Sequence, residues 1–159
     1  MSSLLEQSMY GLSQVFLLPV LALIVALFLY AFWVLGAFGV DSWRRRGGNS
    51  RPLLRAWQAD PSLDSDDLDL IAHRLLEAPR IASRVTPMMG LVATMIPMGP
   101  ALKSLADGNL ASVSENLTVA FSAVILALIA ASITYWVVNV RRRWLAEEIL
   151  DIESRRSAA

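Results

Sequence analysis

Three hydroxyl side chains within apolar stretches of the sequence are the first candidates for chemistry: Thr94, Thr118 and Ser122. Thr94 lies ten residues after Arg84 and nine before Lys103, at the centre of a stretch without charges. No Asp, Glu, His, Lys or Arg lies at the centre of these stretches, so the chain cannot by itself carry a proton there on an acid or a base. The three hydroxyls are the polar groups that these stretches offer in place of an acid or a base. The simpler alternative is that each one donates to a carbonyl of its own helix, one turn earlier.

Other side chains give no pattern that could hold a metal or a cofactor. The chain has no cysteine, which excludes thiolate metal sites and cysteine nucleophiles. His73 is the only histidine, and an EF-hand counted from Asp64 would need glycine and glutamate where Asp69 and Leu75 stand. The 14 basic and 14 acidic residues cancel, so net charge does not favour nucleic-acid binding. We therefore expect no metal, no cofactor and no nucleic acid.

The elements that carry the hydroxyls are predicted to be membrane helices. Mean hydropathy is +0.50, and 18% of residues are charged, below the roughly 25% of soluble domains. Charge-free runs cover residues 15–40, 85–102 and 116–140, and a helix of about 20 residues crosses a bilayer. The first run is too long for a signal peptide and lacks a basic leader, which indicates a retained anchor. The second contains prolines and glycines, so we expect a kinked span, with a buried soluble helix or re-entrant loop as the alternative.

The positions of the basic residues predict the topology. Thirteen of the fourteen are arginines, between residues 41 and 84 or after residue 140, whereas the stretch between the second and third runs holds only Lys103. The positive-inside rule then places both arginine clusters in the cytoplasm and the N-terminus outside. The expected topology anchors are Arg44, Arg45, Arg46, Arg141, Arg142 and Arg143. The predicted segments are an extracytoplasmic N-terminus (1–14), a first membrane helix (15–40), a cytoplasmic connection (41–84), a second membrane helix (85–102), an extracytoplasmic loop (103–115), a third membrane helix (116–140) and a cytoplasmic helical tail (141–159).

Within the cytoplasmic connection we expect a hinge at residues 47–50 and an amphipathic helix at 62–78. In the third run, small residues recur at helical spacing and form a stripe: Ala120, Ala123, Ala127, Ala130 and Ala131. Small residues let membrane helices approach closely. Two other spans have little capacity to bury this stripe, so we expect a homo-oligomer, with packing inside one chain as the alternative. Ala120, Ala127 and Ala131 are assigned to helix packing.

The start of the second run has a familiar sequence. Residues 86–94, Thr-Pro-Met-Met-Gly-Leu-Val-Ala-Thr, resemble the Ala-Pro-Leu-Leu-Gly-Leu-Leu-Gly-Thr that opens the second span in the MotA/TolQ/ExbB proton-channel family. The third run is a looser match, with Ala120-Phe121 and a closing stretch at 135–139. The resemblance implies an all-α, three-span protein that forms a ring, a pentamer, with the second and third spans lining a pore. Two membrane helices of a MotB/TolR/ExbD-like partner, each with one aspartate, would occupy that pore.

On this resemblance Thr94 matches the family's pore threonine, and Thr94, Thr118 and Ser122 are assigned to the ion pathway. Other positions depart from the family. The threonine of the third span falls at Val124, with Ser122 nearest, and a polar outer position falls near Val119. The proline in the inner half of that span falls at Ile133. Residues expected to contact the pore and the partner helices are Pro87, Gly90, Met95, Pro97, Met98, Ala123 and Val124.

The expected function is that of a pore-forming, stator-like subunit of a plasma-membrane motor driven by an ion-motive force, and not that of an enzyme. A non-conducting membrane scaffold of the same fold is the alternative, and the valines at 119 and 124 favour it. A small transporter subunit would need a charged or aromatic pocket at the midplane of the bilayer, and the sequence offers none.

Overall fold

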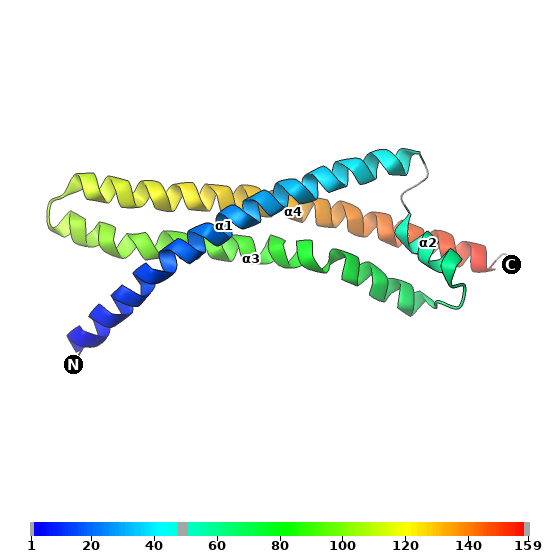
Figure 1. Cartoon of the computed structure of the whole chain (residues 1–159), viewed down its shortest axis with the longest axis horizontal. Helices are drawn as coiled ribbons and strands as arrows, with labels where there is room; N and C mark the ends of the chain where they lie inside the picture. The colour runs from blue at the N-terminus through cyan, green and yellow to red at the C-terminus, as the bar shows by residue number, and fades with distance from the viewer. Residues whose placement is uncertain (1, 48–50, 158–159) are drawn as a thin grey trace. The chain divides into compact units, whose positions relative to one another are not determined.

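The computed structural model describes residues 2–47 and 51–157, with side chains at residue 11 and from residue 14 onward. Four helices make up the described chain (Figure 1): α1 (Ser2–Arg46), α2 (Pro52–Ala59), α3 (Ser65–Ala106) and α4 (Leu110–Ser157). Three of them contain segments long and apolar enough to cross a membrane: Gln14–Arg46, Ser65–Ala106 and Leu110–Ser157. The prediction of an all-α, three-span chain is confirmed.

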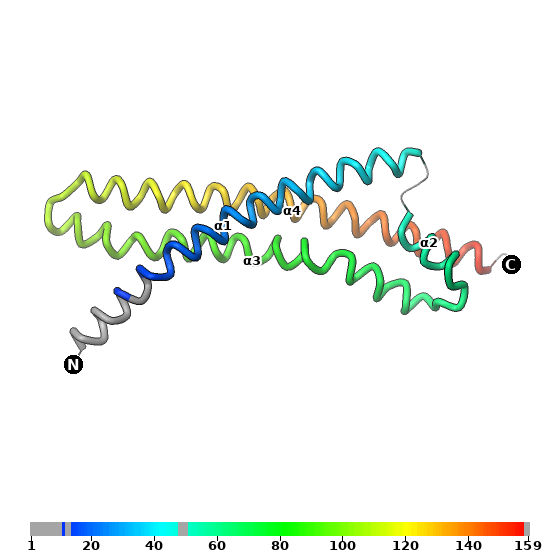
Figure 2. Tube along the Cα trace, in the orientation of Figure 1, coloured from blue at the N-terminus to red at the C-terminus, as the bar shows by residue number. Residues whose placement is uncertain are grey.

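The long helices continue through positions where the sequence suggested boundaries. The structure has one helix, α3, where we expected an amphipathic helix at 62–78 and a separate span at 85–102, and its trace can be followed without a break in Figure 2. Proline is tolerated inside membrane helices, because neighbouring helices and local adjustments satisfy the freed carbonyls. α2 was not predicted. The expected hinge at 47–50 lies, apart from Gly47, outside the described residues.

The connection between α3 and α4 is shorter than the range 103–115 assigned to the outer loop. α3 ends in a Schellman motif: Gly108 has a φ of 73°, its N–H donates to Leu105 O at 3.1 Å, and the N–H of Asn109 donates to Ser104 O at 2.9 Å. The side-chain oxygen of Asn109 then accepts the N–H of Ser112 at 3.2 Å and caps α4. These caps produce the tight turn at the closed end of the α3–α4 hairpin (Figure 1).

The chain forms two compact units, and each is described separately. The first, here named the hairpin unit, consists of Met1–Ala31 and Ser83–Ser132. The second, here named the charged unit, consists of Phe32–Ala82 and Ile133–Ala159. Each of the three long helices is divided between the two units: α1, α3 and α4.

Small residues form the centre of the hairpin unit. The buried cluster consists of Val20 and Ile24 from α1, Ala93 from α3, and Ala123 and Ala127 from α4. Leu21, Met89 and Leu126 pack against its edge. Two helices that meet through alanine can approach more closely than helices that meet through larger side chains.

A leucine-rich core holds the charged unit together. Its buried members come from α2, α3 and α4: Leu53, Leu68, Ala72, Leu76, Leu145 and Ile152. α2 begins with proline at its first position, where the missing N–H costs nothing, and packs Leu53 into this core. The apolar stripe at the start of α3 therefore has neighbours in α2 and α4.

Candidate functional site

α3 and α4 approach each other tightly at Gly90 in the hairpin unit. A Cβ atom added to Gly90 would lie 2.9 Å from the Cβ of Ala127 and 3.4 Å from a methyl carbon of Val124. A separation of 2.9 Å is too short for two carbon atoms, so only glycine fits there without a shift. This contact fixes how α3 and α4 face each other.

Thr94 lies one turn of α3 beyond Gly90. Its Oγ1 donates a hydrogen bond to the carbonyl of Leu91 at 2.7 Å, so the hydroxyl is bonded to its own helix, as the simpler alternative predicted. A hydroxyl that donates in this way keeps its lone pairs and can still accept a hydrogen bond or solvate a cation. The side chain is half-buried.

Thr94 lies on the side of the α3–α4 hairpin away from α1. Residues turn by about 100° each around an α-helix, which places Thr94 about 40° from Gly90 and on the opposite side from Met89. Met89 packs against the buried cluster that includes Val20 and Ile24 of α1. By the same geometry Val124 lies to one side of Ala127, and Leu126 lies on the other side, against α1. We name this surface the Thr94 face; its members are Leu91, Thr94, Met98, Phe121, Val124 and Leu128.

Thr118 and Ser122 do not lie on the Thr94 face. Both line a groove of about 320 Å³ between α1 and α4, together with Leu21, Ile24 and Val25 of α1. The Oγ1 of Thr118 donates to the carbonyl of Ser114 at 2.8 Å, again within its own helix. The structure therefore brings two of the three candidate hydroxyls together and places the third elsewhere.

The residues expected to contact a pore or partner helices divide by exposure. Gly90, Pro97 and Ala123 are buried within the chain, where they bring α3 and α4 together. Met95 and Met98 are exposed, with 62% and 45% of their surface accessible, and Pro87 and Val124 are half-buried. The exposed and half-buried members remain available to a neighbouring chain.

The alanine stripe of α4 is buried in the single chain, contrary to our expectation. Ala120, Ala123, Ala127, Ala130 and Ala131 all have less than a tenth of their surface exposed. Packing inside one chain covers part of the stripe: Gly90 of α3 lies against Ala127, and Ala93 of α3 with Val20 and Ile24 of α1 shares a buried cluster with Ala123 and Ala127. The stripe therefore gives no argument for an oligomer.

The charged unit contains a buried carboxylate that the sequence analysis missed. Glu148 of α4 is 3% exposed, accepts a hydrogen bond from Arg45 Nη1 at 3.0 Å and accepts the N–H of Leu53 at 3.1 Å. Leu53 is in the first turn of α2, whose N-terminus favours an anion. Burial raises the pKa of the Glu148 carboxyl, and the Leu53 N–H and the Arg45 charge oppose that rise. The sequence contained an indication of this burial, because Glu148 lies three residues after Leu145 and four before Ile152, on the helix side that faces the core.

Further ion pairs and an aromatic stack surround Glu148. Arg45 donates to the carbonyl of Trp144 at 3.2 Å and lies 4.9 Å from the centre of its ring. The ring of Phe38 stacks on the Trp144 ring with a centroid distance of 5.0 Å, and it meets the Trp136 ring edge-on at 5.1 Å. Two of the other ion pairs in this unit are Arg51–Asp151 at 2.9 Å and Arg141–Asp41 at 2.5 Å. Three of the six expected topology anchors are thus paired with carboxylates of the unit: Arg45, Arg141 and Arg143.

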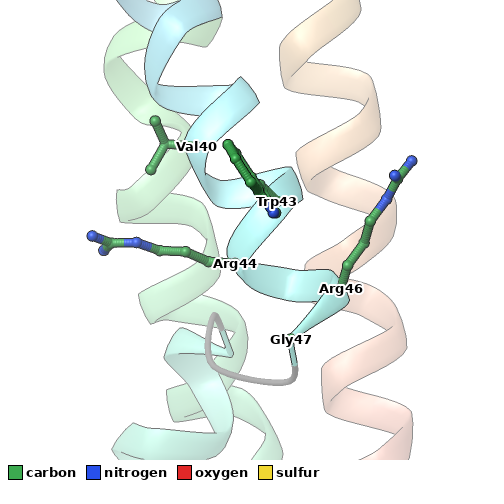
Figure 3. A pocket seen from close by; sticks show the side chains of 5 residues that line it. All are labelled: Val40, Trp43, Arg44, Arg46 and Gly47. Carbon is green, nitrogen blue, oxygen red and sulfur yellow. The ribbon is translucent and has the colours of Figure 1, made fainter.

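Arg44 and Arg46 are exposed in the last turn of α1. The last turn of α1 borders an open hollow of about 670 Å³, where Trp43 is 78% exposed. Figure 3 shows the side chains of Arg44 and Arg46 pointing away from each other, so they do not converge on one ligand. Tryptophan beside arginine suits the headgroup layer of a bilayer. Arg142 and Arg143 of α4 are likewise exposed.

In residues 2–47 and 51–157, no group of three or more His, Cys, Asp or Glu side chains could hold a metal ion. His73 is exposed, and its Nδ1 lies 3.1 Å from the carbonyl oxygen of Asp69 in the same helix.

Three long apolar helices and a close-packed hairpin define a multi-pass membrane protein. A family model described as the MotA/TolQ/ExbB proton channel family matches residues 71–154, just over half of the chain. The chain belongs to this family, whose members are channel proteins and not enzymes. The matched range includes the Thr94 face and the buried Glu148. Comparison with curated proteins and with solved structures found no match.

Proposed function

We propose that this chain is the pore-lining subunit of an ion-driven membrane motor, most simply a proton-driven one. In this proposal a ring of copies, a pentamer, surrounds the membrane helices of a MotB/TolR/ExbD-like partner that carries an intramembrane aspartate. The observation that supports it is the Thr94 face, which places one hydroxyl among apolar side chains on the side of the hairpin away from α1.

The chemistry of the Thr94 face fits a site to which this chain contributes a hydroxyl and a partner protein contributes a carboxyl group. The membrane spans of this chain have no titratable acid or base at their centres, so a carboxyl group that takes up and releases the ion must come from elsewhere. Thr94 Oγ1 donates to Leu91, and its free lone pairs are suited to accept from a protonated carboxyl or to solvate a hydrated proton. The exposed Met95 and Met98 beside it are flexible apolar side chains that can repack against a moving helix.

The available energy is sufficient for stepwise motion. One elementary charge that moves down 100 mV releases about 2.3 kcal/mol, which biases a step between equivalent positions around a ring. In this proposal the charged unit lies in the cytoplasm and the N-terminus outside the plasma membrane, as the positive-inside rule predicts from the arginine clusters.

The alternative is a scaffold of the same fold that does not conduct. Val124 favours it, because this residue lies on the Thr94 face where the family has a threonine, so each subunit contributes one hydroxyl to that face instead of two. Both proposals require the same ring, and they differ in whether ions cross.

The test is proton flux into proteoliposomes that contain the chain together with a single-span partner bearing an intramembrane aspartate. Thr94→Val is nearly isosteric and should reduce flux about tenfold, since a lost hydrogen bond to an ion costs roughly 1–3 kcal/mol. Thr94→Ser should retain most of the flux. Ser122→Ala is the matched control, because it removes a hydroxyl from the groove against α1.

The outcomes separate the proposals. Flux that is absent from the wild-type complex would favour the scaffold. Flux that is equal in wild type and Thr94→Val would remove Thr94 from the pathway, and a loss in Ser122→Ala would support the prediction that Thr118 and Ser122 belong to it. Val124→Thr, which adds the second hydroxyl to the face, should increase flux if the Thr94 face lines the pathway.

A further inference from the structure

Four arginines line a cavity of about 240 Å³ in the charged unit: Arg45, Arg51, Arg55 and Arg141. They come from different parts of the chain. Arg45 is near the end of α1, Arg51 directly precedes α2, Arg55 is in α2 and Arg141 is in α4. Guanidinium groups bind phosphate with paired, parallel hydrogen bonds, which makes arginine the side chain best suited to phosphate recognition.

The cavity holds more positive than negative charge. Its lining includes two carboxylates, Asp41 and Glu148, against four guanidinium groups. Glu148 is buried and committed to Arg45 and to the N–H of Leu53. Asp41 is half-exposed and paired with Arg141, so this pair can open toward a stronger anion. Arg51 is also paired, with Asp151 at 2.9 Å just outside the lining. An entering anion therefore meets two more guanidinium groups than carboxylates in the lining, and it competes with Asp41 for Arg141 and with Asp151 for Arg51.

The rest of the lining is apolar and lies where a lipid headgroup would be. Leu75, Leu76, Trp144 and Leu145 form these walls. Asp41 and Arg141 are the first charged residues after the runs 15–40 and 116–140, which puts the cavity at the surface of the bilayer. Tryptophan is also typical of this depth.

We propose that this cavity binds the phosphate group of an anionic ligand, which is either the headgroup of an anionic phospholipid or a soluble phosphate ester. The phosphate contacts Arg141 and Arg51, and the apolar walls accept the glycerol or carbon part of the ligand. Bound there, it would connect the end of α1, the start of α2 and the start of the charged part of α4. This site is independent of ion conduction, and its test does not involve flux.

The experiment measures ligand binding to the purified full-length chain in detergent by native mass spectrometry. One arm titrates short-chain phosphatidylglycerol against phosphatidylcholine, and a second arm titrates glycerol 3-phosphate against glycerol. Arg141→Gln and Arg51→Gln should each weaken binding about tenfold, whereas Arg142→Gln is the matched control, one residue along the helix, exposed and outside the cavity. Asp41→Asn removes the competing carboxylate and should strengthen binding about fivefold, an increase that a folding defect cannot produce.

Phosphatidylglycerol binding that depends on Arg141 but not on Arg142, with no binding of glycerol 3-phosphate, would identify a lipid headgroup site. The same dependence for glycerol 3-phosphate would identify a soluble phosphate ester. The proposal is overturned if neither anion binds more tightly than its neutral control. Equal effects of Arg141→Gln and Arg142→Gln, or unchanged binding in Asp41→Asn, would also overturn it.

Discussion

The hairpin unit and the charged unit are built from parts of the same helices but are held together by different interactions. In the hairpin unit, glycine and alanine bring helices into direct contact, as at Gly90 and Ala127. In the charged unit, a leucine-rich core is combined with ion pairs around Glu148. The hydrophobic effect does not drive apolar side chains together in lipid, so membrane helices associate through close packing. In water the same effect drives leucine side chains into a core.

The largest effect is expected at the buried carboxylate of the charged unit. Glu148→Ala leaves Arg45 and the Leu53 N–H without their shared acceptor, and breaking a buried pair costs roughly 3 kcal/mol or more. All five tryptophans lie in the charged unit, so thermal unfolding followed by tryptophan fluorescence reports on it directly. Glu147→Ala, at an exposed neighbour, is the control and should change stability by less than about 0.5 kcal/mol. Equal losses in both variants would contradict the role of Glu148.

A smaller effect is expected at the tight contact of the hairpin unit. Gly90→Ala places a carbon 2.9 Å from the Cβ of Ala127, and such overpacking costs about 1–3 kcal/mol. Gly36→Ala in α1 is the control, because an added Cβ there meets nothing within 4 Å. Thermal unfolding in detergent, followed by circular dichroism, compares the two. A double variant with Ala127→Gly should recover part of the loss, and the absence of any coupling would show that the contact is not tight.

The smallest effect is a pH dependence confined to the charged unit. The pKa of the Asp151 carboxyl lies below its ordinary value of 3.8, because Arg155 donates hydrogen bonds to it and the charge of Arg51 adds to this effect. Its stabilisation is present above that ordinary value and is lost as the pH falls further, toward the lowered pKa in the folded state. Glu148 acts in the opposite sense: its pKa is raised, so proton uptake above its ordinary value of 4.5 makes the folded state slightly more stable as the pH falls.

Thermal unfolding, followed by tryptophan fluorescence at a series of pH values from neutral to pH 3, measures both the loss of stability through Asp151 and the gain through Glu148. Asp151→Asn should reduce the loss of stability below the ordinary pKa of 3.8. Glu148→Gln should remove the gain in stability that occurs as the pH falls toward 4.5. An unchanged profile in Asp151→Asn would show that Arg155 and Arg51 do not hold this carboxyl in its charged form.

The spans could be predicted from sequence because charged residues are absent from long runs and because helices in lipid must satisfy their own backbone. The continuity of α3 could not be predicted, since proline usually breaks a helix in a soluble protein but is accommodated inside α3. The helical spacing of Thr118 and Ser122 puts them on one side of α4, but only the structure shows that α1 covers that side. Glu148 was missed because a carboxylate is normally exposed, and its partners lie on α1 and α2, far away in sequence.

The anion that holds the first turn of α2 has a consequence for how the protein is made. The Leu53 N–H and its acceptor Glu148 are separated by 95 positions in the chain. The ribosome therefore synthesises all three predicted spans before it adds the carboxylate to which α2 is bonded. The short helix therefore cannot make this hydrogen bond until the part of α4 that carries Glu148 has been synthesised.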